Sequence, residues 1–122
     1  MTGFADTDAV EAYYRHVDAE EYEAVFDLFA ENITYTRSGP RVIQGIEEFQ
    51  DFYVHDRALR GEHTIDRIVV DGDVVAVQGR FAGTKLTDGS EASFGFADFL
   101  RFDPDGLITE RATYNNMLGE PL

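Results

Sequence analysis

An aspartate lies in the middle of an aromatic run in this sequence, FGFADFLRF at residues 94–102. Successive side chains of a β-strand point to opposite faces of the sheet, so the even-numbered residues share one face. That face holds Phe94, Phe96, Asp98, Leu100 and Phe102. A carboxyl group is costly to ionise in apolar surroundings. Asp98 could therefore stay protonated and donate a hydrogen bond to a ligand oxygen, or it could be ionised and paired with a buried arginine.

His63 and Arg37 also have side chains suited to a binding or catalytic site. An unperturbed imidazole exchanges protons near neutral pH, so His63 could be a general base, or else an exposed histidine at the start of a strand. A guanidinium cannot accept a proton at ordinary pH, so Arg37 cannot be that base. Three interpretations of Arg37 remain: it binds a carboxylate or carbonyl of a ligand, it pairs with Asp98, or it is exposed in a loop.

The spacing of apolar residues predicts three helices in the first half of the chain. Apolar side chains recur three and four residues apart over residues 10–17, 22–29 and 46–53, which is typical of amphipathic helices. A short strand, ITYT at residues 33–36, is expected between the second and the third helix.

From about residue 63 the apolar pattern changes to the period of two that is typical of strands. Turn sequences at 71–72, 88–89 and 103–106 separate four long strands. We therefore predict an α+β fold in which a cone-shaped, curved antiparallel sheet is covered on its concave face by three N-terminal helices, a cystatin-like α+β roll. Such a fold leaves a cavity between helices and sheet, and Asp98 would point into it.

With 122 residues, 43% of them hydrophobic and 13% aromatic, the chain is expected to form one domain over residues 1–122. No apolar run approaches the roughly 18–20 residues that a bilayer-spanning helix needs. The N-terminal sequence lacks the basic and apolar regions of a signal peptide, and cysteine is absent. We therefore expect a cytoplasmic protein without disulfides or thiolate chemistry.

Acidic residues outnumber basic ones by 24 to 10, which gives a formal net charge of −14. Nucleic acids and anionic membranes require clustered basic residues, so neither is an expected partner. The acidic, lysine-poor composition resembles that of proteins from high-salt cytoplasms and predicts a halophilic source. Neither a phosphate-binding glycine motif nor the spacing of a metal site occurs, so no cofactor and no metal are expected.

Four segments, VEAYYRHVDAEEYEAVFDLFAENITY, GIEEFQDFY, DGDVVAVQGRF and ADFLRFDPDGLITERATYNN, cover most of the chain. Together they resemble the nuclear transport factor 2-like superfamily, and within it the SnoaL-like and ketosteroid-isomerase-like branch. The resemblance implies the α+β fold predicted above. It does not imply one activity, because this fold hosts isomerases, cyclases, epoxide hydrolases, dehydratases and non-catalytic binders.

The resemblance implies roles for several pocket residues. Asp98 matches the acid that ketosteroid isomerases use to donate a hydrogen bond to the substrate oxyanion, and Tyr13 matches its partner tyrosine. His63 stands where SnoaL-like proteins frequently keep a pocket histidine. The resemblance also places three residues of the last strand in the pocket: Arg111, Thr113 and Asn115.

The chain departs from the resembled enzymes at two places. Arg37 stands where the isomerases carry their catalytic base. Asn115 and Asn116 stand where SnoaL-like relatives often have an acid, and an amide cannot deprotonate a water molecule. The sequence therefore does not support isomerisation through a carboxylate at position 37. It supplies only part of the set of residues that epoxide hydrolysis uses in the resembled branch.

We predict a cofactor-independent acid/base enzyme, such as an isomerase, cyclase or hydrolase, that acts on a small, largely apolar molecule with a carbonyl or hydroxyl group. Asp98 and Tyr13 would polarise an oxygen, and His63 would be the base. The predicted substrate-binding residues are Arg37, Arg111, Thr113, Asn115, Phe96 and Leu100. The alternative is a non-catalytic ligand-binding or dimerisation domain of the same fold, which the missing acids favour.

The outer face of the predicted sheet is partly apolar as well. Ala97 and Phe99 lie on the odd-numbered face of residues 94–102, and Ala112 and Tyr114 are candidates for the same face. An apolar face left in water predicts a partner, most simply a second copy of the chain across a two-fold axis. We therefore expect a homodimer through the outer sheet face, as is common in the resembled family.

Overall fold

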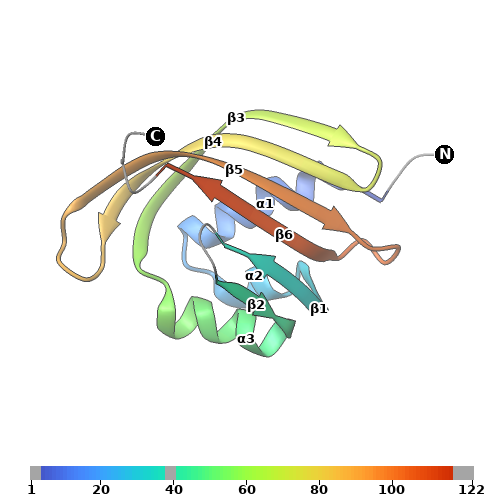
Figure 1. Ribbon diagram of the computed structural model, residues 1–122, viewed down its shortest axis with the longest axis horizontal. Coiled ribbons are helices and arrows are strands. Elements are labelled where there is room, and N and C mark those ends of the chain that lie inside the picture. The colour runs from blue at the N-terminus through green and yellow to red at the C-terminus, as the bar shows by residue number, and fades with distance from the viewer. Residues whose placement is uncertain (1–3, 38–40, 117–122) are drawn as a thin grey trace.

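The computed structural model describes residues 4–37 and 41–116 of the chain (Figure 1). The helices are α1 (Thr7–Asp18), α2 (Tyr22–Phe26), α3 (Gly45–Asp51) and a π-helical turn that follows it, η1 (Phe52–Asp56). The strands are β1 (Phe29–Thr36), β2 (Val42–Gln44), β3 (Leu59–Asp71), β4 (Val74–Lys85), β5 (Glu91–Phe102) and β6 (Ile108–Asn115). The α+β class predicted from the sequence is confirmed.

All six strands form one curved sheet in the order β2-β1-β6-β5-β4-β3 (Figure 1). The four long strands β3 to β6 form an antiparallel meander, as the turn sequences predict. The strand β1 instead pairs in parallel with β6, so the expectation of a wholly antiparallel sheet is wrong. A period of two shows which side chains share a face, but it carries no information about the direction of a neighbouring strand.

The second predicted helix is shorter than its apolar pattern suggests. The helix α2 ends at Phe26, and Phe29 begins β1 instead of extending the helix. Both rings are buried, so a helix end followed by a strand satisfies the same spacing of three residues. The strand β2 has no counterpart in the prediction, because only its central residue, Ile43, is buried.

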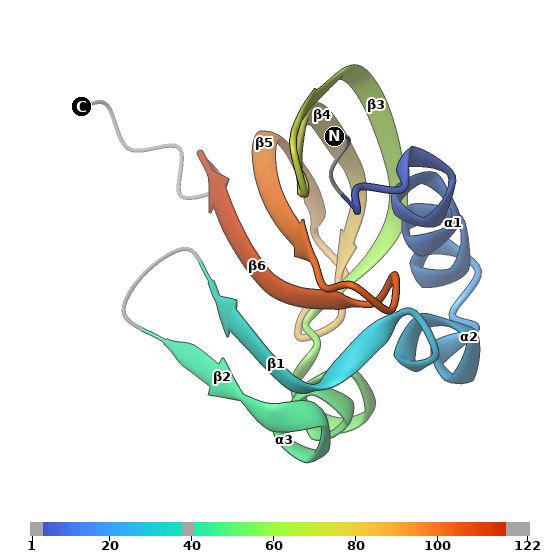
Figure 2. The same cartoon turned by 90° about the vertical axis from the view of Figure 1, so that its right-hand side faces the viewer.

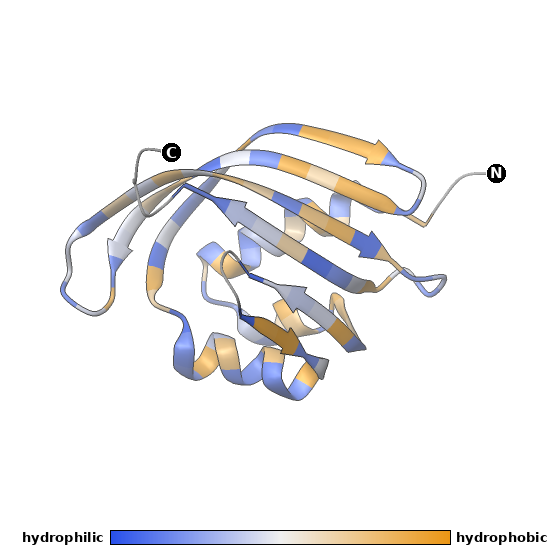
Figure 3. Cartoon of the chain, in the orientation of Figure 1, coloured by the Kyte–Doolittle hydropathy of each residue, from blue (hydrophilic) through white to orange (hydrophobic). Residues whose placement is uncertain are grey.

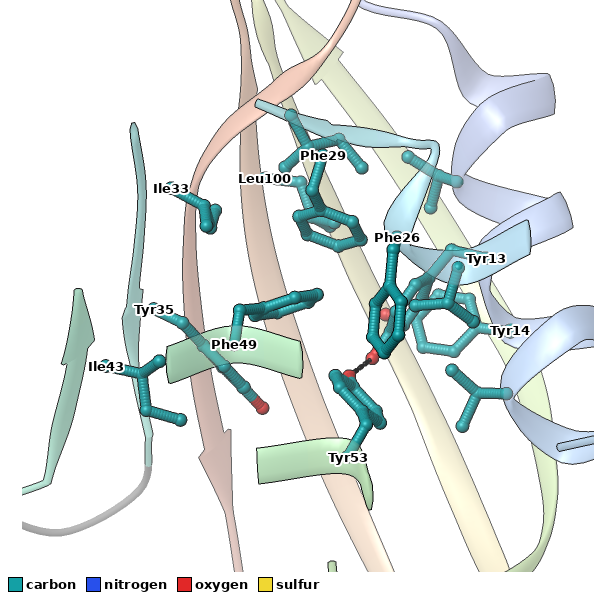
Figure 4. Close-up of a cluster of buried hydrophobic side chains, with 14 of the residues drawn as sticks. Tyr13, Tyr14, Phe26, Phe29, Ile33, Tyr35, Ile43, Phe49, Tyr53 and Leu100 are labelled. Carbon is teal, nitrogen blue, oxygen red and sulfur yellow. Dashed lines mark hydrogen bonds between the residues drawn. The ribbon is translucent and has the colours of Figure 1, made fainter. Parts of the chain in front are cut away.

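One hydrophobic core joins the helices to the concave face of the sheet. The helix α1 lies along that face, and α3 packs against β1 (Figure 2). The side chains of α1 meet those of α2, β1 and η1 in a cluster of aromatic rings (Figure 4). From the sheet, the core includes Val75, Val77, Phe96, Leu100, Phe102 and Ile108.

The two ends of the long strands differ in polarity. Hydrophobic residues gather where β3 and β4 meet at their connecting turn, whereas the end where β4 leads into β5 is more hydrophilic (Figure 3). Near the middle of β4, a Cβ atom on Gly79 would lie 2.4 Å from the Thr64 backbone oxygen and 2.9 Å from the Phe96 ring. Only glycine permits this approach, so Gly79 lets the paired strands bend and gives the Phe96 ring room on the concave face.

Candidate active site

A cavity of about 200 Å³ is lined by residues of α1, η1 and the concave face of the sheet. Its wall includes all the predicted site residues but one: Tyr13, Arg37, His63, Phe96, Asp98, Arg111, Thr113 and Asn115. The exception, Leu100, is completely buried in the core (Figure 4). It shares the face of Asp98 but lies one pair of residues farther along β5, and the prediction that it binds substrate is wrong.

Asp98 is completely buried and accepts hydrogen bonds from three side chains. The Arg111 guanidinium donates through Nη2 at 2.9 Å, and the hydroxyls of Tyr14 and Thr113 donate to the two carboxylate oxygens. Because the Arg111 guanidinium is charged and can only donate, its 2.9 Å contact with Asp98 fits an ionised carboxylate and not a neutral donor. The buried-arginine interpretation therefore holds, with Arg111 as the partner in place of Arg37.

Arg111 is held on several sides by tyrosines. Its Nη1 donates to the hydroxyl of Tyr53 at 3.0 Å and also to that of Tyr13, and its guanidinium carbon lies 4.5 Å from the ring centres of both Tyr13 and Tyr35. Burial lowers the pKa of Arg111, but the Asp98 carboxylate and the neighbouring tyrosines together outweigh burial and leave that pKa well above its ordinary range. The guanidinium therefore stays charged inside the protein.

Tyr13 and Tyr53 form a second hydrogen-bonded pair on the cavity wall (Figure 4). Burial raises the pKa of Tyr13 well above 10.0 and also raises the pKa of Tyr53, so both hydroxyls keep their protons near neutral pH. The tyrosine that donates to the Asp98 carboxylate is the adjacent Tyr14, which the sequence did not single out for the site. Arg111 links Tyr13 to Asp98 by donating to both.

His63 has an orienting carboxylate that the sequence did not identify. Its Nδ1 lies 2.6 Å from Oδ1 of Asp18, the last residue of α1, and its backbone N–H donates to Oδ2 at 2.8 Å. The imidazole packs among the rings of Tyr14, Phe81 and Phe96 and is only 15% exposed. The alternative of an exposed histidine at a strand start is therefore wrong.

The helical spacing of α1 could have marked Asp18 as a residue of the site. Tyr14 and Asp18 are four residues apart on α1, so they share a face of the helix. That face meets β3 and β5, where Asp18 pairs with His63 and the Tyr14 hydroxyl donates to Asp98. No comparable local signal marks Tyr53, which reaches the site from η1.

Arg37 follows β1 and also lines the cavity. Its guanidinium carbon lies 4.3 Å from the centre of the Phe52 ring, and its Nε is buried without a hydrogen-bond partner in the described parts of the chain. Asp98 is occupied by Arg111, so Arg37 is not its partner. Of the three interpretations of Arg37, ligand binding is the one that its position favours.

A metal-binding cluster and a membrane-spanning helix are both absent from residues 4–37 and 41–116. No group of three or more histidine, aspartate or glutamate side chains is placed to hold a metal ion. None of the helices there combines the length and the apolar character needed to cross a membrane.

The fold and site define the class: an α+β domain whose curved sheet and helices line a small cavity. The chain belongs to the SnoaL-like domain family, which matches residues 10–111. The matched range contains both Asp18 and His63 as well as Asp98 and Arg111. No curated protein matches the chain in sequence.

Solved structures share the fold at low sequence identity. An NTF2-like protein of unknown function from Burkholderia pseudomallei K96243 is 16% identical, with a TM-score of 0.83 over 93% of this chain and 92% of that one. An LEH-like epoxide hydrolase from M. tuberculosis is 22% identical, with a TM-score of 0.80 over 92% and 85%. SalBIII, an epoxide hydrolase/cyclase-like enzyme of pyran ring formation in salinomycin, is 20% identical, with a TM-score of 0.82 over 92% and 91%. At these identities the likeness shows the fold alone.

Proposed function

We propose that the protein is a cofactor-independent enzyme that transfers a proton within a small, largely apolar molecule bearing a carbonyl or hydroxyl group. The observation that carries this proposal is the Asp18–His63 pair on the cavity wall. Because Asp18 occupies Nδ1, Nε2 is the nitrogen that can take a proton from a ligand and return it. A base within hydrogen-bonding distance of an orienting carboxylate is the arrangement that general base catalysis needs.

The tyrosine pair supplies the complementary donor. Tyr13 and Tyr53 carry two hydroxyl protons, one of which is used in the bond between them. Arg111 donates to both oxygens, so the second hydroxyl proton is left for a ligand oxygen in the cavity. A hydroxyl backed by a buried cation stabilises negative charge that develops on that oxygen. In this proposal Asp98 positions Arg111 and does not itself touch the substrate.

The two groups together account for a balanced proton transfer. His63 removes a proton from a carbon next to a carbonyl, and the tyrosine hydroxyl stabilises the oxygen of the resulting enolate. The protonated imidazole then returns the proton to the same carbon or to another atom of the substrate. The net outcome is isomerisation, ring closure or loss of water, according to which bonds the substrate offers.

Proton exchange with solvent tests the proposal without knowledge of the natural substrate. We expect the protein in D₂O to accelerate exchange of the α-protons of cyclohexanone, measured by NMR. His63→Gln should lower that acceleration by about 10²–10⁴-fold. His16→Gln is the matched control, because His16 also bonds a carboxylate, Glu21 at 2.9 Å, but does not line the cavity. Equal exchange rates in the two variants would contradict a catalytic His63.

The alternative function is a non-catalytic binding domain. It is favoured by Arg37 at the position of the isomerase base and by the amides at positions 115 and 116. Cyclohexanone that binds, by chemical shift changes of cavity residues, without any accelerated exchange would support this alternative.

A further inference from the structure

The wall of the cavity carries an excess of positive charge in a strongly acidic chain. Arg37, Arg57 and Lys85 line it, and we call these three residues the rim. Asp98 is the one carboxylate among the described lining residues, and it is already paired with Arg111. The rim cations are therefore uncompensated within the wall, although the chain as a whole has a net charge of −14. A cavity with this polarity attracts anions.

The rim residues come from separate elements at the same end of the molecule. Arg37 follows β1, Arg57 follows η1, and Lys85 ends β4 (Figure 1). Two of them have other neighbours: Arg57 donates to the Tyr22 hydroxyl at 3.1 Å, and Lys85 lies within electrostatic range of Asp88. Arg37 is the rim cation with a buried donor that no described residue satisfies.

The environment of Arg37 suits a carboxylate ligand. The guanidinium lies against the Phe52 ring, which fixes its plane and shields one side from water. A buried N–H without an acceptor is unfavourable, and its side-on edge, Nε with one Nη, matches the two oxygens of a carboxylate. A carboxylate bound there would satisfy the donor and neutralise the charge.

We propose that the substrate is a small organic acid with a single ring, whose carboxylate binds Arg37 and whose reacting atoms lie at His63. This inference rests on the proposed function for the role of His63. An apolar cavity of about 150 Å³ holds one benzene molecule, so about 200 Å³ suits one substituted ring. The rings of Phe81, Phe94 and Phe96 supply the apolar wall against which such a ring would pack.

Benzoate and its neutral analogue benzamide test the inference by calorimetric titration. We expect benzoate to bind at least about tenfold more tightly than benzamide, and Arg37→Gln to remove that preference while leaving benzamide binding unchanged. Arg41→Gln is the matched control. Arg41 lies 5.4 Å from the same Phe52 ring, pairs with Asp56 at 2.8 Å and does not line the cavity. Its variant should keep both affinities.

Three results would overturn the inference: equal binding of benzoate and benzamide, equal loss of benzoate binding in the two arginine variants, or no binding of either compound. The titration requires no turnover, so it is independent of the exchange assay. Benzoate binding that depends on Arg37, together with no catalysed exchange of cyclohexanone, would leave the carboxylate site at Arg37 standing and remove the proposed catalysis at His63.

Discussion

The two faces of the sheet hold arginine–carboxylate pairs in opposite surroundings. On the concave face, Arg111 and Asp98 are 5% and 0% exposed and are surrounded by tyrosines. On the convex face, Arg80 holds Asp66 through two hydrogen bonds of 2.9 and 3.0 Å, and the two side chains are 66% and 40% exposed. The distances are nearly the same, so geometry alone does not separate the pairs.

Water makes the difference between them. When an exposed pair forms, the two charges lose contacts with water and gain a contact with each other of similar strength. Dissolved salt further weakens their attraction. A buried pair has lost its hydration, so each partner depends on the other and on the surrounding hydroxyls. We therefore expect folding to depend strongly on the pair on the concave face and hardly at all on the pair on the convex face.

The largest effect is expected when the buried pair is broken. Asp98→Ala leaves the Arg111 charge buried without its partner, so we expect the free energy of unfolding to fall by about 3–5 kcal/mol. Urea denaturation of the purified variant measures it. The double variant Asp98→Leu with Arg111→Met removes both charges and should recover much of the loss. A double variant no more stable than Asp98→Ala would show that the charge pairing is not the cause.

The tyrosines of the concave face predict a pH dependence. Burial raises the pKa values of Tyr13 and Tyr14 well above 10.0, so the folded protein keeps protons that the unfolded chain releases above that pH. The associated stability is fully present below pH 10.0 and is lost as the pH rises toward the folded values. Urea denaturation on both sides of pH 10.0 should show this decline, and Tyr13→Phe should reduce its slope. An unchanged slope in that variant would contradict the assignment.

The apolar part of the convex face leads to a prediction about assembly. Phe99 and Tyr114 are 46% and 57% exposed and form an edge-to-face pair with ring centres 6.0 Å apart. We propose that a second copy of the chain covers them. Sedimentation should then give a dimer at micromolar concentration in wild type and a monomer in Phe99→Asp, since a buried aromatic at an interface contributes about 2 kcal/mol or more. Val54→Asp, at a 58% exposed site on η1, is the control that should stay dimeric. A monomeric wild type would exclude this dimer.

The smallest effect is expected for the exposed pair. Arg80→Gln should leave the melting temperature almost unchanged, and any difference should disappear in high salt. Scanning calorimetry of wild type and variant at low and high salt measures both. A loss of stability comparable to that of Asp98→Ala would break the comparison on which these predictions rest.

The sequence predicted the faces of the strands better than the partners within the site. The period of two placed Asp98 correctly on the concave face, because alternation follows from backbone geometry alone. The helical spacing of α1 did not show whether Tyr13 or Tyr14 contacts Asp98. Both tyrosines are buried, and the packing of the helix on the sheet decides which hydroxyl reaches the carboxylate. The bond between Asp18 and His63 joins residues 45 apart: helical spacing places Asp18 on the face of Tyr14, but no local pattern identifies His63 as its partner.

Elements with weak burial patterns were the hardest to predict. The strand β2 has one buried residue, and β1 shows a register shift between Phe29 and Thr34 that interrupts its alternation. The choice of Arg111 over Arg37 as the partner of Asp98 depends on which face of β6 turns toward the core, although the pairing of β6 with β5 itself follows from the turn sequences. The burial of β6 does not alternate cleanly, so its sequence did not show that Arg111 faces inward.

The charge balance inside the cavity has a consequence for how this domain can change its ligand. Asp98 and Arg111 cancel each other, so the rim residues decide the sign that an incoming molecule meets. Those residues stand after β1, after η1 and at the end of β4, and none of them belongs to the aromatic core. In the inference drawn from Arg37, ligand preference and folding depend on different residues, so exchanging the rim alone is a route to a new specificity.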